Sequence, residues 1–289
     1  GNTHTYSNIM TTLKDQLGPL ADLIGTWTSP QDDPTGLNVI AVPSPGSTPN
    51  DKGSFDLLTR PYRETLTFEV ADPGARNRGG DVDQLVGAIA YKQQVFATDQ
   101  EKEQLHVEVG MFLYLKNKNS VPADSTLIPA PTFSIARSAT IPHGVSALLL
   151  GNSSESDGPP VIQMIDTKPI LVPKVPAYTK VYRHSIGESP NQILVDAISK
   201  QKIVHTTSFS LDSDNEGQIS NIPFITERAN TPRVRWDMWL ETVDNGDGTT
   251  TQQLQYSQNI DLVFHKQFNG VGTILWPHVT VNTLTKQCD

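Results

Sequence analysis

The sequence predicts an all-β fold, a single antiparallel β-barrel of about ten strands over residues 1–289, with short terminal and inserted helices. The chain has 20 glycines and 21 prolines, which suits strands joined by turns better than a helical bundle. Hydrophobic residues make up 36% of it, enough to fill the core of one large domain. Several segments also alternate apolar and polar residues with the period of two that half-buried strands have.

The N-terminal part is expected to form a short helix, a break and a first strand. Residues 7–24 carry apolar side chains at roughly helical spacing, with a break at Gly18. The strand then opens with a Gly-x-Trp motif formed by Gly25 and Trp27. In lipocalin-like barrels such a glycine turns tightly while the indole plugs the closed end of the barrel. A tryptophan that is simply part of the core is the alternative.

Alternating segments give the other expected strands. These are residues 62–70, 85–97, 105–115, 132–138, 202–211, 233–243 and 250–264. The last two are joined by a hairpin turn at 244–248. Both faces of segment 105–115 carry large apolar side chains, so this strand is expected to lie between the lumen and an outer covering. Arg137 is aligned with Phe133 and Ile135, which indicates either a place at the barrel mouth or a specific anionic partner.

Two stretches are interpreted as loop insertions into the barrel, at about residues 30–54 and 151–200. The first is rich in proline, and the second combines Ser, Asp, Gly and Pro with a short amphipathic helix at 191–200. Neither stretch marks a domain boundary.

Charge and composition exclude several classes of function. The formal net charge of -9 argues against a nucleic-acid partner, because affinity for phosphate backbones rests on clustered Lys and Arg. No apolar run approaches the roughly 20 residues needed to span a bilayer. Cys288, the single cysteine, cannot form an internal disulfide or a thiolate metal cluster, which fits a cytoplasmic location. Because the sequence begins at Gly1, removal of an upstream export signal is the alternative.

The common catalytic motifs are absent from the sequence, including glycine-rich phosphate loops, paired cysteines, His-Glu-x-x-His and Gly-x-Ser-x-Gly. What remains for chemistry is a set of seven histidines, His4, His106, His143, His184, His205, His265 and His278. No two of them have the spacing of a zinc pair. His205 shares a strand face with Ile203 and Phe209 and is expected to be a core residue.

Six short segments together resemble the landmarks of a known family. In chain order they are Leu20–Trp27, Tyr62–Phe68, Ile89–Tyr91, Leu105–Phe112, Phe133–Ser138 and Trp276–Val279. Their order along nearly the whole chain is similar to that of the nitrobindins, which are haem-binding β-barrel proteins of fatty-acid-binding-protein-like shape. The resemblance implies the same closed barrel.

The resemblance also implies a cofactor near the C-terminus. In nitrobindins the histidine of the matching Pro-His step is the proximal ligand of a five-coordinate haem. The match therefore implies that His278 binds the iron of a ferric haem b, held against an apolar wall, with the sixth position open or water-filled. Neutral imidazole is a common axial ligand, and one suffices because the porphyrin supplies four nitrogens. Pro277 is expected to begin a short final helix that fixes the direction of the ring.

Four further residues follow from the same match. Leu105 and His106 correspond to positions that line the haem pocket. Arg137 occupies the place of a polar pocket residue and suits a haem propionate or a distal anion. His143 lies where the family chain follows the pocket wall, which implies a distal role.

The expected function is therefore haem binding, with nitric oxide or another diatomic gas as the ligand of the iron. The resemblance also implies peroxynitrite isomerase or peroxidase-like activity on an oxidant. The alternative is a carrier without haem, whose barrel holds a fatty acid or other apolar small molecule with the carboxylate on Arg137.

Overall fold

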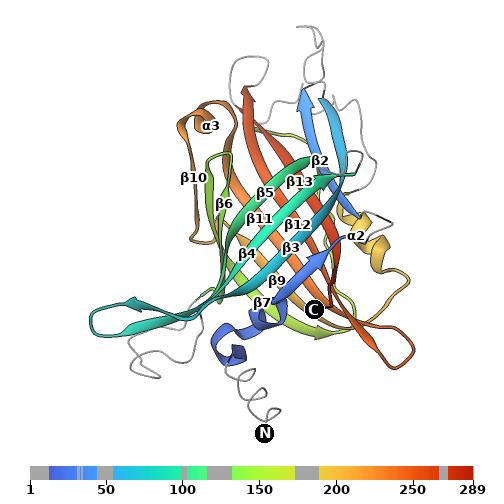
Figure 1. Ribbon diagram of the computed structural model, residues 1–289. Helices are drawn as coiled ribbons and strands as arrows, with labels where there is room; N and C mark the ends of the chain where they lie inside the picture. Colours follow the sequence, from blue (N-terminus) through green and yellow to red (C-terminus); the bar gives the residue numbers. More distant parts are fainter. Residues whose placement is uncertain are drawn as a thin grey trace.

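The strands form one antiparallel sheet that closes on itself as a barrel (Figure 1). The computed structural model describes residues 13–30, 33, 35–43, 55–98, 103–115, 132–172, 189–266 and 273–288. The strands are β1 (Gly25–Thr28), β2 (Gly36–Pro43), β3 (Phe55–Arg78), β4 (Asp83–Ala97), β5 (Gln104–Tyr114), β6 (Ile135–Ile141), β7 (Val145–Asp157), β8 (Ile170–Val172), β9 (Lys202–Asp212), β10 (Gln218–Asn221), β11 (Asn230–Asp244), β12 (Thr250–Lys266) and β13 (Thr273–Lys286). The helices are η1 (Gly18–Leu23), α2 (Asn191–Ile198) and α3 (Pro223–Arg228).

Closure of the barrel depends on two short strands that share one position in the ring. The long strands follow the order β13, β12, β11, β9, β7, β6, β5, β4 and β3. Between β3 and β13, β1 pairs with both neighbours at one end of the barrel and β2 pairs with both at the other. This confirms the predicted all-β barrel of about ten strands. The prediction of loop throughout 30–54 is wrong for residues 36–43, because β2 completes the ring there.

The N-terminal helical segment plugs one end of the barrel. Residues 13–17 are helical and run into η1 at Gly18, whose φ of +55° lies in the left-handed region that favours glycine. The start of the expected helix, at residues 7–12, lies outside the described residues. Leu20, Leu23 and Trp27 are fully buried, and Trp27 Nε1 donates a hydrogen bond to the Leu23 carbonyl at 2.8 Å. Trp27 also belongs to the buried core cluster, so its position fits both interpretations of the Gly-x-Trp motif.

Within the described residues, no helix has the length and apolar composition of a membrane span.

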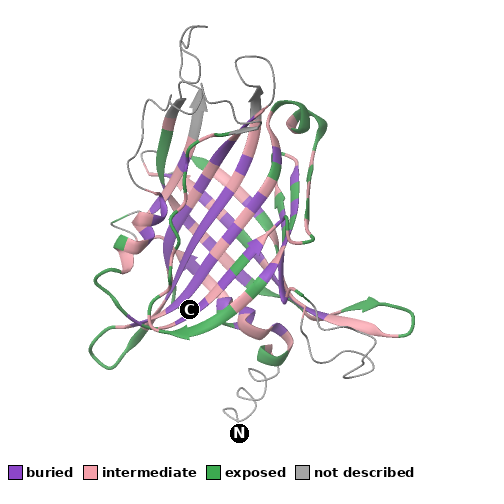
Figure 2. Cartoon of the chain, turned by 180° about the vertical axis from the view of Figure 1, so that it is seen from behind, coloured by how far each residue is buried: buried purple, intermediate pink, exposed green. Residues whose placement is uncertain are grey.

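Inward-facing apolar side chains fill the part of the lumen next to the helical plug. Figure 2 shows buried positions alternating with less buried ones along the strands of the wall. The inward members of the cluster include Leu66, Phe68, Ile89, Phe112, Leu149, Phe209, Met238, Leu254 and Leu284. The alternation fixes the register, because a slip by one residue would turn this whole set outward.

Strand β5 shows which of its two faces is inside. Glu108 and Phe112 are almost fully buried, whereas Val109 and Met111 are 47% and 44% exposed. The expectation that both faces are covered is wrong, since these two apolar side chains meet solvent. The inward face is the one that carries a glutamate.

The second insertion covers part of the outer wall. Residues 151–157 belong to β7, so the insertion begins later than predicted. Helix α2 lies in the predicted place and buries Leu194 against Trp239 of β11 and against Val279 and Val281 of β13. Figure 1 shows α2 on the outside of the barrel wall. The insertion therefore supplies apolar cover for strands of the wall.

A carboxyl group is buried close to this cover. Glu241 of β11 is fully buried, and its Oε1 accepts a hydrogen bond from Gln253 at 2.8 Å. Gln253 in turn exchanges hydrogen bonds with Gln201, which follows α2. The Oε2 atom of Glu241 has no hydrogen-bond partner in the described part of the chain. Burial raises the pKa of Glu241 to about 8, although the bond from Gln253 acts in the opposite direction.

The raised pKa of Glu241 predicts that its contribution to stability falls as pH rises. Between about 4.5, the ordinary pKa of a glutamate in an unfolded chain, and about 8, the folded protein holds a proton that the unfolded chain has released. Glu241→Gln should therefore match the wild type near pH 4 and exceed its unfolding free energy by on the order of a few kcal/mol at pH 8. Urea unfolding followed by tryptophan fluorescence measures both values.

The exposed Glu227 provides a control for this comparison. Glu227→Gln should leave the pH dependence of unfolding unchanged. If the difference in unfolding free energy between Glu241→Gln and the wild type is the same at pH 8 as at pH 4, the Glu241 carboxyl is not held neutral in the folded protein.

Candidate functional site

A cavity of about 170 Å³ lies at the end of the barrel opposite the helical plug. It is bounded by side chains of β2, β3, β4, β5, β12 and β13 and by the turn between β6 and β7. The lining residues are Asn38, Tyr62, Gln93, Val95, Leu105, His106, His143, Gln258, Ile260, His278 and Thr280. Of the other histidines in the sequence, His4 and His184 are outside the described residues.

Four of the five predicted site residues line this one cavity. Leu105 and His106 come from β5, His143 from the β6–β7 turn, and His278 from β13. Arg137 is the exception, because it lies deeper in the lumen. Three histidines that are far apart in the sequence therefore share a cavity wall.

His278 lies in the middle of β13, so the expectation of a helix beginning at Pro277 is wrong. The strand is held by β12 on one side and β2 on the other, which fixes the backbone at this point. The His278 ring contacts the Asn38 Oδ1 atom through Nε2. Burial, together with the nearby charge of His106, lowers the pKa of His278 to about 4. The imidazole is thus neutral at physiological pH, which is the form that ligates metals.

Arg137 is fully engaged inside the barrel. Its Nη2 donates to Glu108, its Nη1 donates to Gln258 Oε1 at 2.9 Å, and its Nε donates to the Tyr91 hydroxyl at 3.1 Å. The guanidinium also stacks over the Trp236 ring, with its central carbon 4.2 Å from the ring centroid. Of the two alternatives from the sequence, a specific anionic partner is correct. In this arrangement Arg137 is committed to protein partners rather than to a propionate or a fatty-acid carboxylate.

Glu108 connects this buried pair to the cavity wall. It is fully buried and accepts hydrogen bonds from Arg137 and Tyr91, while its second oxygen lies 3.4 Å from His106 Nε2. Burial alone would raise the pKa of Glu108, but the Arg137 charge and the hydrogen bonds outweigh it and hold this pKa at about 2. The carboxylate is therefore ionised and gives His106 a fixed hydrogen-bonding partner.

A second buried carboxyl group lies beneath the cavity floor. Glu64 accepts hydrogen bonds from Tyr256, from Gln93 at 2.6 Å and from Asn282 at 2.9 Å. Tyr62, which lines the cavity, shares a 2.6 Å hydrogen bond with Tyr256. Burial raises the pKa of Glu64, and its hydrogen bonds oppose this effect only in part. Beneath the cavity, the Glu108 carboxyl is therefore ionised, whereas burial disfavours ionisation of the Glu64 carboxyl.

The cavity is more polar than expected. An apolar wall was predicted, but only Val95, Leu105 and Ile260 are aliphatic among its lining residues. The sequence reasoning also missed the floor, formed by Tyr62, Gln93 and Gln258 above Glu64 and Glu108. A signal was present, since Glu64 lies between Tyr62 and Leu66 on the inward face of β3, and Glu108 shares the inward face of β5 with Phe112.

His205, expected to be a core residue, lies elsewhere. Its side chain is 40% exposed and lies 3.6 Å from Glu155 and 3.7 Å from Asp157. The expectation is wrong because β9 reaches the rim of the barrel at this position, where the lumen opens.

Comparison with known protein families matches residues 16–208 to the THAP4-like, haem-binding β-barrel domain. The chain belongs to this family. Comparison with curated proteins finds no significant match. Among solved structures, the chain is similar to Rv2717c from M. tuberculosis, with 13% identity over 94% of this chain and 99% of that one, and a TM-score of 0.37.

The match to the haem-binding β-barrel family ends within β9. It therefore includes Leu105, His106, Arg137 and His143 but stops before β13 and His278. Within the described residues, no group of three or more His, Cys, Asp or Glu side chains is arranged to hold a bare metal ion. A porphyrin brings four of its own nitrogens and needs one protein ligand. A cavity wall that offers single imidazoles therefore provides what a porphyrin requires of the protein.

The buried pair predicts a large stability loss for Arg137→Met. This change leaves the Glu108 carboxylate buried without a counter-ion, which costs about 3–5 kcal/mol of unfolding free energy. Chemical denaturation of the variant measures the loss. Adding Glu108→Gln to Arg137→Met should recover part of it, because the uncompensated charge is then gone.

A surface ion pair serves as the matched control. Arg60 lies 3.3 Å from Glu103, and both side chains are exposed. Arg60→Met should cost less than about 1 kcal/mol. Equal losses for Arg60→Met and Arg137→Met would contradict a structural role for the buried pair.

Proposed function

We propose that this protein binds haem at the open end of the barrel, with His278 as the axial ligand of the iron. The observation that carries the proposal is the cavity itself, where His278, His106 and His143 line one space at the end of a barrel from a haem-binding family. His278 is the strongest candidate of the three. It lies on a strand paired on both sides, and its low pKa keeps its ring neutral.

The other cavity residues have distinct roles in this proposal. Asn38 orients the His278 ring, as a hydrogen-bonding neighbour does for most metal-binding histidines. Because Nε2 faces the Asn38 Oδ1 acceptor, Nε2 carries the ring proton and Nδ1 carries the lone pair. Rotation of the Asn38 amide away from the ring would allow the opposite arrangement. His106, held by Glu108, offers a polar group from the β5 wall, and His143 does so from the β6–β7 turn.

The enclosed volume limits how much of the cofactor is covered. Pockets that bury most of a small ligand usually measure roughly 300–1,000 Å³. The cavity measures about 170 Å³. It would therefore enclose only part of a porphyrin, and the rest would lie outside the cavity.

Bound haem would supply an iron atom that can bind a small ligand. The resemblance to the nitrobindins suggests nitric oxide or peroxynitrite as that ligand. The chain's own contribution is the axial imidazole, the two histidines and the polar floor. The floor places Tyr62, Gln93 and Gln258 as hydrogen-bonding groups at the bottom of the cavity. The rival function, a carrier with a carboxylate on Arg137, loses its main support because Arg137 is paired with Glu108.

Titration of the purified apo-protein with haemin tests the proposal. The wild type should give a saturable, shifted Soret band. His278→Ala should weaken haemin binding by more than roughly tenfold, since even residues that only support a metal ligand are typically worth 10–100-fold. Added imidazole should restore the band of His278→Ala by filling the vacated ligand position.

His106→Ala and His143→Ala are the matched controls, because both residues line the same cavity. Each should keep the band position of the wild type. A titration of His278→Ala that is identical to the wild type would contradict the assignment, and loss of the band in one of the controls would move the ligand there.

A further inference from the structure

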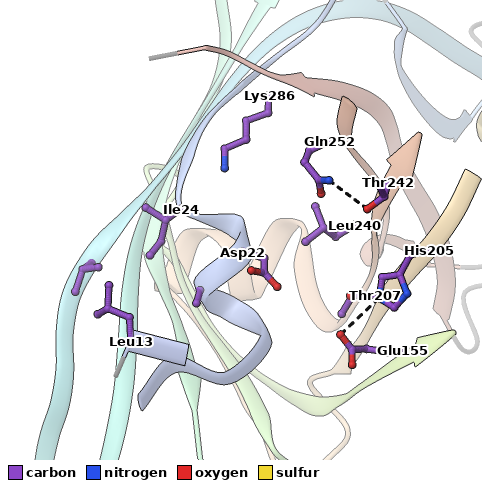
Figure 3. Close-up of a pocket in the computed structure, with 12 residues that line it drawn as sticks. Leu13, Asp22, Ile24, Glu155, His205, Thr207, Leu240, Thr242, Gln252 and Lys286 are labelled. Atoms are coloured by element: carbon purple, nitrogen blue, oxygen red, sulfur yellow. Dashed lines mark hydrogen bonds and ion pairs between the residues drawn. The ribbon is translucent and has the colours of Figure 1, made fainter. Parts of the chain in front are cut away.

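A second and larger cavity lies at the plugged end of the barrel (Figure 3). Its volume is about 570 Å³. It opens between the N-terminal helical segment, the inner part of β3 at Val70 and the ends of β7, β9, β11, β12 and β13. The lining residues are Leu13, Ala21, Asp22, Ile24, Val70, Glu155, His205, Thr207, Leu240, Thr242, Gln252 and Lys286.

Lys286 brings an unpaired positive charge to this cavity. No carboxylate of the described residues forms an ion pair with its ammonium group, which lies 5.7 Å from the centroid of the Trp27 ring. The lysine side chain crosses Gly25, where a Cβ atom would come within 2.8 Å of the lysine Cε. Glycine at this position therefore makes room for the lysine. Figure 3 shows Lys286 extending from its strand toward the cavity.

The two acidic residues of the cavity wall do not contact Lys286. Asp22 forms an ion pair with Lys14 at 2.7 Å. Glu155 lies 3.6 Å from His205, as the dashed line in Figure 3 shows. Lys286 is the one lysine or arginine among the lining residues, and in the described part of the chain it forms no ion pair. The cavity is therefore suited to a ligand with one anionic group.

One part of the lining is aliphatic and suits the apolar chain of a ligand. Leu13, Ile24 and Leu240 provide aliphatic surface, and the hydroxyls of Thr207 and Thr242 provide isolated hydrogen-bonding groups. A volume of about 570 Å³ falls within the range of roughly 300–1,000 Å³ typical of small-molecule sites. Such sites are mostly apolar with a few polar groups that fix orientation.

We propose that this cavity binds a small amphipathic carboxylate, with its carboxylate on Lys286 and its aliphatic chain against Leu13, Ile24 and Leu240. The site is separate from the haem site. Lys286 and His278 are eight residues apart on β13, which corresponds to about 26 Å along the strand. Binding at one end therefore does not require the other.

Calorimetric titration with decanoate tests this site, and decyltrimethylammonium is the matched probe of opposite charge. The wild type should bind decanoate saturably and bind the cationic amphiphile at least about tenfold more weakly. Lys286→Gln should weaken decanoate binding by about tenfold, the effect of losing one charge-assisted hydrogen bond. Lys286→Arg keeps the charge and should retain most of the affinity.

Two further variants separate this site from the haem site. Thr242→Phe places a larger side chain in the cavity beside Leu240 and should weaken decanoate binding, while haemin binding persists. His278→Ala should bind decanoate as the wild type does, whatever its response to haemin. Absence of saturable decanoate binding, equal affinity for the two amphiphiles, or a Lys286→Gln variant that binds like the wild type would overturn the proposal.

Discussion

The interior of the barrel is organised around the buried ion pair between Glu108 and Arg137. A lone charge in the lumen would be strongly destabilising, so each member is tolerated only because the other is present. Their remaining hydrogen-bonding groups are engaged by Tyr91 from β4 and Gln258 from β12. The network therefore links four strands around the wall. It also separates the apolar half of the lumen, next to the helical plug, from the cavity at the opposite end.

Local patterns predicted most of the strands but not which face of each strand is inside. Alternation marked β4, β5, β9, β11 and β12 correctly, because period-two burial is a property of single strands. For β5 both faces are apolar enough to be buried. The choice of the Glu108 face depends on Arg137, which is 29 positions away and is brought near by pairing of β5 with β6. Strand β2 was missed for a related reason, since its place is defined by β3 and β13 rather than by its own proline-flanked sequence.

The family resemblance supplied candidate site residues that spacing could not. It pointed to Leu105, His106, Arg137, His143 and His278, and all of these except Arg137 line one cavity, while their role in haem binding stays a prediction. The floor beneath them could not be predicted in this way. It is built from single polar residues on separate strands, such as Gln93, which are ordinary in the sequence and meet only when the barrel closes. Long-range register, rather than any local motif, makes the cavity polar.

Strand β13 connects the two ends of the barrel and explains how one chain can offer two separate cavities. It pairs with β12 along its length, while β2 and β1 hold its other edge at opposite ends. His278 and Lys286 are separated by an even number of residues, so both side chains lie on the same face of the strand. Between them Leu284 packs into the apolar cluster and Asn282 donates a hydrogen bond to Glu64, so packed side chains occupy the lumen at that level. Packed side chains therefore separate the two cavities along the barrel axis. The lumen holds one cavity at each end and is not a continuous channel.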